Sequence, residues 1–358
     1  MPRVLGIDPG TRSFDLCGLE DGEVCFEASL PSAEVAARPE RLLERVRQAL
    51  PLDLVAGPSG YGLPLVPIAA LGERELRLVC LAEGEPGAGA LGLRRLLRLL
   101  RESGLPVVIT PGVIHLPSVP RRRKLNRVDL GTADKVCCAA LGIADQARRL
   151  GIPPRETAFV LVELGGAFSA VLSVAGGRIV SGQGGSSGPL GFLAAGALDA
   201  ELAVLLRDVG KALVFSGGAA DVAGDAGLEP ETLAARRDPE ADLAREALVE
   251  SVVKAVAGEL ALVPDAREVL LSGRLSRIAG FREPLAEALA RLAPVRELAP
   301  AASKHAALGA ALLADGLAGG RHRELVDALG LRDARGTVLD HVFLKGADAV
   351  RRWVESGS

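Results

Sequence analysis

The chain has 358 residues, of which 49% are hydrophobic, 24% charged and 3% aromatic, and its formal net charge is −3. A chain of this length fits two domains of ordinary size, each able to bury its own core. The small net charge gives no field that would gather nucleic acid or an anionic membrane surface. The sequence therefore argues against both as partners.

Cysteine spacing and hydropathy exclude two further classes. The five cysteines include no Cys-x-x-Cys pair, so the sequence indicates neither a zinc site nor a disulfide framework. No apolar run approaches the roughly 20 residues that span a bilayer, and no basic leader precedes the first apolar segment. We therefore expect a cytoplasmic protein.

The first half of the chain alternates predicted strands and helices. It opens with a strand-turn-strand unit over 3–19, whose turn is Asp8-Pro9-Gly10-Thr11. Helices are predicted, from apolar residues at helical spacing, over 34–50, 91–102 and 132–150. Short buried strands are predicted at 53–56 and 107–110, and a glycine-rich loop at 57–62. This alternation predicts an α/β lobe.

A proline pair, Pro153-Pro154, marks the predicted lobe boundary because a helix cannot propagate through it. We assign an N-terminal lobe to 1–152, a C-terminal lobe to 153–320 and a helical tail to 321–358. The C-terminal lobe opens with another strand-turn-strand unit over 158–174, so the opening of the first lobe is repeated. Its later predicted elements are helices over 195–207, 239–262, 281–292 and 303–317 and a buried strand over 268–272.

The two glycine turns are the strongest indication of chemistry. Asp8 precedes Gly10, Thr11 and Arg12 in the first turn. Glycine lets the backbone approach a polyphosphate closely, and a carboxylate beside such a turn can hold Mg²⁺ through water. Either turn alone is more simply an ordinary hairpin, but a pair opening successive lobes predicts a phosphate site. The corresponding residues of the second turn are Glu163, Gly165 and Gly166.

The strand over 268–272 stops at Gly273-Arg274 and leads into a helix. Such a turn can place backbone against a flat adenine, and an arginine can stack on the base or reach a phosphate. A generic strand-to-helix turn is the competing interpretation.

Three segments are candidates for acceptor binding. Asp134 and Lys135 begin the helix over 132–150, where Asp134 can act as a general base or orient magnesium and Lys135 can neutralise the transferred group. The alternative is an acidic residue opposing a helix dipole. A basic run over 121–127 can grip an anionic acceptor, and the loop over 57–62 can close over it. Their candidate side chains are Arg123, Arg127, Ser59 and Tyr61.

The segments 4–15, 160–170 and 269–278 resemble the phosphate-one, phosphate-two and adenosine motifs of the acetate and sugar kinase, chaperone and actin superfamily. Within it the chain most resembles an archaeal-type family of predicted butyrate kinases. The resemblance covers about residues 1–318. It implies two ribonuclease-H-like lobes, the duplicated actin-like ATPase fold, with Mg²⁺-ATP in the interlobe cleft, and metal-binding roles for Asp8 and Glu163.

The chain also departs from its relatives. Acetate and butyrate kinases carry Asn at the position of Asp8 and His at that of Glu163, and Arg274 replaces the second glycine of their adenosine motif. The leading hypothesis is a kinase that phosphorylates a small carboxylic acid. A kinase for a hydroxyl acceptor, like pantothenate or sugar kinases, and an ATP-gated regulator both stay open. The tail over 321–358 is a candidate for docking a partner or the second subunit of a homodimer.

Overall fold

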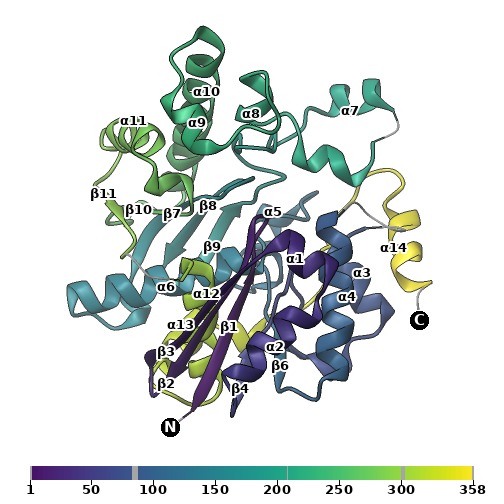
Figure 1. The fold of residues 1–358 in the computed structure, drawn as a ribbon. Helices are drawn as coiled ribbons and strands as arrows, with labels where there is room; N and C mark the ends of the chain where they lie inside the picture. Colours follow the sequence, from purple (N-terminus) through teal and green to yellow (C-terminus); the bar gives the residue numbers. More distant parts are fainter. Residues whose placement is uncertain (1, 83–87, 208, 300–302, 357–358) are drawn as a thin grey trace.

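The protein is described by a computed structural model that covers residues 2–82, 88–207, 209–299 and 303–356, with only the backbone described at 88–91. Two sheets, one in each half of the chain, have helices packed around them (Figure 1). This arrangement confirms the predicted α/β fold of two lobes.

The first sheet has the strand order β3-β2-β1-β4-β6-β5. Strands β1, β2 and β3 are antiparallel neighbours, whereas β1, β4 and β6 are parallel. The strands are β1 (Arg3–Pro9), β2 (Ser13–Glu20), β3 (Glu23–Pro31), β4 (Leu54–Ala56), β5 (Val66–Pro67) and β6 (Val107–Ile109).

The second sheet, ordered β11-β10-β7-β8-β9, repeats this pattern. Its antiparallel part is β7-β8-β9, and β10 and β11 continue parallel to β7. The strands are β7 (Ala158–Leu164), β8 (Ser169–Ala175), β9 (Arg178–Gln183), β10 (Val269–Ser272) and β11 (Val295–Glu297). The two strand-turn-strand units predicted from the sequence therefore occupy equivalent places in the two sheets.

The helices of the N-terminal half are α1 (Ser32–Ala37), α2 (Glu40–Gln48), α3 (Glu73–Cys80), α4 (Ala88–Glu102), α5 (Arg121–Lys124) and α6 (Ala133–Leu150). Those that follow are α7 (Ala200–Leu206), α8 (Ala219–Val222), α9 (Pro230–Ala235), α10 (Pro239–Leu260), α11 (Ala279–Leu289), α12 (His305–Leu317), α13 (Arg323–Leu329) and α14 (Ala347–Glu355). In the described part of the chain, none is long and apolar enough to cross a bilayer.

The second sheet is buried on both faces. Alternate residues of β7 point to opposite sides of the sheet, and each set packs into a different core. Phe159 and Leu161 join a core that includes α6 and α12, whereas Val160 and Val162 join a second core with α10 and α11. Helices α6 and α12 thus lie between the two sheets (Figure 1).

Helix α12 belongs by sequence to the predicted C-terminal lobe but packs against the first sheet. A Cβ atom on Gly6 of β1 would lie 2.3 Å from the carbonyl oxygen of Ala307, so only glycine permits this approach. Helix α13 follows α12 in the chain and packs against both α12 and α6. The boundaries at 152/153 and 320/321 stay predictions. Helix α12 follows the 152/153 boundary in sequence but packs against the sheet of the N-terminal lobe.

Two predicted helices differ most in extent from the observed ones. The helix expected over 34–50 is divided into α1 and α2 at Pro39, because proline disfavours helical backbone in the residue before it and has no N–H to donate. The helix expected over 195–207 begins only at Ala200, where the Asp199 side chain accepts hydrogen bonds from two backbone N–H groups and caps it. Strand β3 and helix α3 were not predicted.

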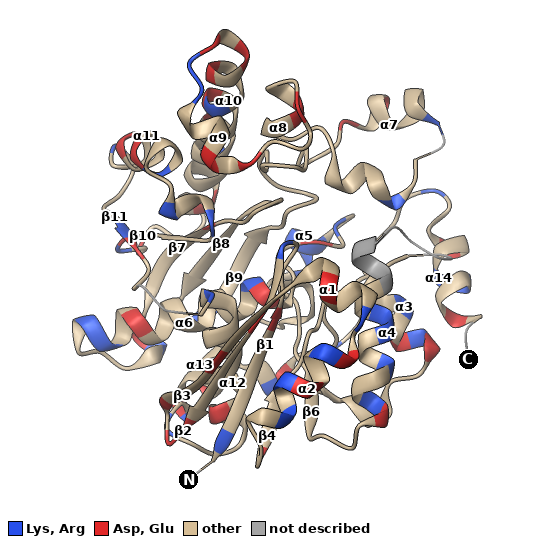
Figure 2. Ribbon diagram, in the orientation of Figure 1, with Lys and Arg blue, Asp and Glu red and all other residues tan. Residues whose placement is uncertain are grey.

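Charged residues of both signs are interspersed over both halves of the molecule (Figure 2).

Candidate active site

A cavity of about 560 Å³ lies between the two halves of the molecule and is lined by residues from both. The ends of β1, β7 and β10 and the start of α6 all contribute to its wall. Of the predicted site residues, it brings together Asp8, Gly10, Thr11, Arg12, Ser59, Tyr61, Asp134, Lys135, Glu163, Gly165, Gly166, Gly273 and Arg274.

The two glycine turns and the turn after β10 face one another. A Cβ atom on Gly166 would lie 3.8 Å from the Cγ atom of Arg12 and 4.0 Å from the Cδ atom of Arg274. These residues come from three turns, so the turns meet at one place, and side chains larger than glycine would narrow the space between them.

Gly273 fixes how closely β10 approaches β7. Its φ of +94° lies in a region that favours glycine, and a Cβ atom there would be 2.2 Å from the carbonyl oxygen of Leu164. The backbone after β10 is thereby held against the second glycine turn.

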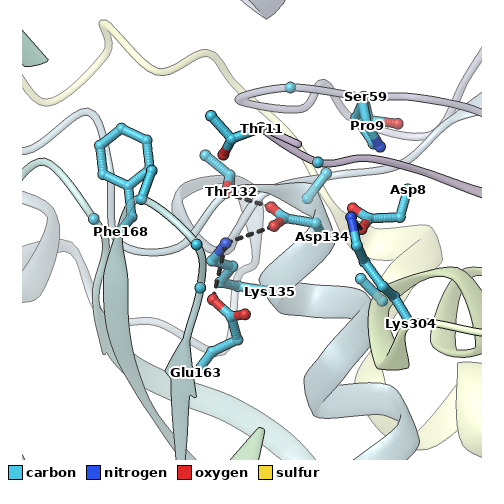
Figure 3. Close-up of a pocket in the computed structure, with 18 of the residues that line it drawn as sticks. Asp8, Pro9, Thr11, Ser59, Thr132, Asp134, Lys135, Glu163, Phe168 and Lys304 are labelled. Atoms are coloured by element: carbon cyan, nitrogen blue, oxygen red, sulfur yellow. Dashed lines mark hydrogen bonds and ion pairs between the residues drawn. The ribbon is translucent and has the colours of Figure 1, made fainter. Parts of the chain in front are cut away.

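Lys135 joins two carboxylates at the centre of the cavity (Figure 3). Its ammonium lies 2.6 Å from Oδ2 of Asp134 and 3.1 Å from Oε2 of Glu163. Thr132, the N-cap of α6, donates a hydrogen bond from its hydroxyl to the other Asp134 oxygen. The helix start thus presents Asp134 and Lys135, and β7 presents Glu163, to the same small volume.

The charges in this cluster stabilise one another. Burial alone would raise the pKa of Asp134, but Lys135 and the Thr132 hydrogen bond lower that pKa overall. Burial would likewise lower the pKa of Lys135, but Asp134 and Glu163 raise it well above its usual value. Asp134 and Lys135 are therefore both charged at neutral pH.

Asp8 has a different environment at the end of β1. Burial raises its pKa to about 7, with Lys304 opposing the increase and the charge of Asp134 adding to it. The ammonium of Lys304 lies 3.6 Å from Asp8 and 2.8 Å from Asp15 of β2. Sequence reasoning missed Lys304, since no local pattern marks a lysine nearly 300 residues from its partners.

The loop over 57–62 contributes unequally to the cavity. The hydroxyl of Ser59 donates to the carbonyl of Gly57 and accepts from the backbone N–H of Thr110, so it organises the loop. The hydroxyl of Tyr61 instead accepts a hydrogen bond of 3.1 Å from Lys211 in the other half of the molecule. Lys211 also lines the cavity and was not predicted.

Arg123 and Arg127 lie outside the cavity lining, unlike the other predicted residues. A guanidinium nitrogen of Arg123 donates to the carbonyl of Val180, 2.7 Å away, and Arg127 is exposed. Helix α5 carries the first part of this basic run, and Arg127 follows it in the segment that leads to α6. The geometry gives no support to acceptor binding by these two arginines.

At the mouth of the cavity, Glu229 holds arginines from both halves of the molecule. It forms ion pairs with Arg12 of the first glycine turn and, at 3.2 Å, with Arg274. Glu231 pairs with Arg274 at 2.9 Å. Arginine binds carboxylate and phosphate with the same fork of donors, so Glu229 occupies groups that could bind phosphate.

The sequence matches the family described as "Protein of unknown function (DUF1464)" over residues 6–344. The chain belongs to this family. No curated protein matches the sequence of this DUF1464 member. Its structure is similar to that of a propionate kinase from Francisella tularensis, with a TM-score of 0.63 and 14% identity over 87% of this chain and 98% of that one.

Two acetate kinases have the same fold. The enzyme from Entamoeba histolytica matches with a TM-score of 0.58 and 10% identity over 81% of this chain and 87% of its own. That from Porphyromonas gingivalis matches with a TM-score of 0.58 and 14% identity over 87% and 98%. These similarities confirm the predicted superfamily fold for the DUF1464 member; the narrower resemblance to predicted butyrate kinases stays a prediction.

The donor set suits a metal that arrives with phosphate. Among the described residues, no three His, Cys, Asp or Glu side chains are grouped as a metal site. Magnesium is commonly held by one or two carboxylates together with substrate phosphates and water. Asp8 and Glu163, each on a glycine turn and each balanced by a lysine, fit that requirement.

Proposed function

We propose that this protein is an ATP-dependent kinase that transfers a phosphoryl group to a small carboxylic acid. The observation that carries the proposal is the meeting of three turns at Gly166, beside the cluster of Asp134, Lys135 and Glu163. The fold shared with an acetate kinase and a propionate kinase supports a carboxylate as the acceptor.

In this proposal the two glycine turns bind the triphosphate. Gly10 and Thr11 from one side, and Gly165 and Gly166 from the other, allow close approach of backbone to phosphate oxygens. Gly273 and the base of Arg274 hold the adenosine. A bound magnesium would be held by Asp8 and Glu163 and would supply charge neutralisation at the phosphates.

Lys135 is proposed to stabilise the negative charge that develops on the transferred group. Its ammonium is fixed between Asp134 and Glu163, so it needs no reorganisation during transfer. Asp134 in turn orients Lys135 and, being ionised, can attract the metal. Positioning and electrostatics supply most of the rate in phosphoryl transfer, and this cluster offers both.

A hydroxyl acceptor is the second candidate, because Asp8 is suited to act as its base. A carboxylate with a pKa of about 7 can take a proton from a hydroxyl at neutral pH. A carboxylate acceptor, already ionised, needs no such base. The two candidates therefore differ in whether Asp8 must accept a proton.

An acceptor panel tests the proposal. Pure protein, Mg²⁺ and ATP are incubated with acetate, butyrate, phenylacetate, pantothenate or glucose, and ADP release is followed. A carboxylate acceptor gives an acyl phosphate, which hydroxylamine converts to a hydroxamate, whereas a phosphate ester does not react. Hydroxamate with any acid supports the leading proposal; a stable ester supports the hydroxyl candidate. Hydrolysis that no acceptor stimulates would contradict both and favour an ATP-gated regulator.

A further inference from the structure

Lys211 differs from the other lysines that line the cavity. Lys135 and Lys304 each have carboxylate partners, but within the described residues Lys211 has no ion pair. Its ammonium donates a hydrogen bond to the hydroxyl of Tyr61 and lies 4.8 Å from the centre of the Tyr61 ring. A partly buried ammonium without a counter-ion is costly, so its presence beside a cavity indicates an anionic ligand.

Asp129 does not serve as that counter-ion. Asp129 influences Lys211 electrostatically, but its Oδ1 accepts from the N–H of Gly131 and its Oδ2 from the N–H and hydroxyl of Ser186. Burial lowers the pKa of Lys211, with Cys80 and Asp129 acting in the opposite direction. A carboxylate bound beside Lys211 would offset the unfavourable free energy of burying its ammonium without a counter-ion.

Apolar side chains line the same cavity as the Lys211 ammonium. Phe168 and Phe215 contact edge to face with their ring centres 5.1 Å apart. The wall continues through Val79, Leu93 and Val214. A ligand that fits here carries one anionic group on an apolar body, because a second charge would find no donor in this wall.

The part of the cavity around Lys211 adjoins the centre proposed for phosphoryl transfer. The carbonyl of Gly60, next to Tyr61, accepts a hydrogen bond from the N–H of Ala133, the first residue of the helix that carries Asp134 and Lys135. Phe168 follows the second glycine turn and lines the same cavity as Lys135. A molecule held at Lys211 is therefore next to the phosphate turns.

We infer that Lys211 and Tyr61, with the wall of Phe168 and Phe215, form the acceptor subsite, and that it takes a monocarboxylate with an apolar body. This inference rests on the proposed kinase function. One carboxylate oxygen accepts from Lys211 while the other forms a bond to the γ-phosphorus of ATP. The bond from that phosphorus to the β–γ bridging oxygen breaks, its electron pair leaves with ADP, and no proton is released from the ionised acid.

Matched acid and amide probes test the subsite. Calorimetry measures the binding of butyrate, butyramide, phenylacetate and phenylacetamide to protein saturated with Mg²⁺ and a non-hydrolysable ATP analogue. We expect at least one acid to bind about tenfold or more tighter than its amide. Lys211→Met should remove that preference, and Lys211→Arg should keep most of it. Lys254→Met, on the exposed surface of α10, is the control and should behave as the parent.

The outcomes separate the two proposals. If the parent fails to bind the ATP analogue, the kinase function is wrong. If the analogue binds but neither acid is preferred over its amide, or if the preference survives in Lys211→Met, the subsite is wrong while the kinase proposal stands. Retained binding of the analogue by Lys211→Met shows that the variant is folded. In turnover, the variant should raise the acceptor KM about tenfold or more, with little change in the KM for ATP.

Discussion

Lys304 lies just before α12, late in the chain, yet its ammonium is 3.6 Å from the Asp8 carboxylate at the end of the first strand. The contact exists because α12 packs on the first sheet rather than on the second. Lys304 also pairs with Asp15, so it remains paired even if Asp8 is neutral. Asp8 can therefore gain or lose its proton near neutral pH while Lys304 keeps an ion pair.

Asp8→Asn should make protein stability less sensitive to pH. The pKa of Asp8 is about 7 in the folded protein and 3.8 in the reference state, so the folded state binds more protons between these values and loses stability as pH rises. The stability of the variant relative to the parent should increase by on the order of 2 kcal/mol from pH 5 to pH 8. Urea unfolding at both pH values measures this, and Asp265→Asn, on an exposed loop, should show no such trend.

Asp8→Ala should lose about 100-fold or more in kcat, since it removes both the charge and the side-chain oxygens from the proposed transfer centre. Steady-state kinetics with the best acceptor from the panel gives the value. Activity within a few-fold of the parent would remove Asp8 from the proposed site, whatever its effect on stability.

Lys135→Met should destabilise the fold by roughly 3 kcal/mol, because it leaves Asp134 and Glu163 without their shared cation. Adding Glu163→Gln removes one of the two uncompensated charges. The double variant should recover about 1 kcal/mol relative to the sum of the single effects. Denaturant titrations of the parent, both single variants and the double variant close this cycle; additive effects would show that Lys135 and Glu163 are not coupled.

The sequence was sufficient to predict the part of the site that is local in the chain. Each glycine turn follows a buried strand, and because β1 and β7 hold equivalent places in their sheets, the turns were expected to converge. Gly273 was predicted from a buried strand that stops at a glycine, and the structure brings it to the second glycine turn because β10 pairs with β7. In each case an apolar run and the glycine after it are visible within ten residues.

The missed features depend on contacts between distant segments. Lys304 and Lys211 reach the cavity only because α12 crosses to the first sheet and the segment before Phe215 folds against Tyr61. Strand β3 was missed because it is an edge strand with mostly exposed side chains, so no continuous apolar run marks it. Such long-range packing has no local signature in one sequence.

Gly273→Ala should be far more damaging than the same change at Gly319. Both glycines have positive φ values, +94° and +85°, so alanine introduces similar backbone strain of about 1 kcal/mol at each. A Cβ atom on Gly319 meets open space, whereas one on Gly273 would lie 2.2 Å from the Leu164 carbonyl oxygen. We expect Gly273→Ala to cost at least about 2 kcal/mol more and to weaken binding of the ATP analogue. Equal destabilisation in urea titrations would show that the close approach is unimportant.

Glu229→Gln should strengthen nucleotide binding. The Glu229 carboxylate holds Arg12 and Arg274 at the cavity mouth, and phosphate must compete with it for these guanidinium groups. Its side chain is 47% exposed, so losing the ion pairs should change stability by less than about 1 kcal/mol. Calorimetry should show the magnesium complex of the ATP analogue binding roughly three- to tenfold tighter.

Glu287→Gln, an exposed change of the same kind on α11, is the control and should leave the affinity unaltered. Weaker binding by Glu229→Gln alone would mean that Glu229 positions the arginines for the nucleotide instead of competing with it.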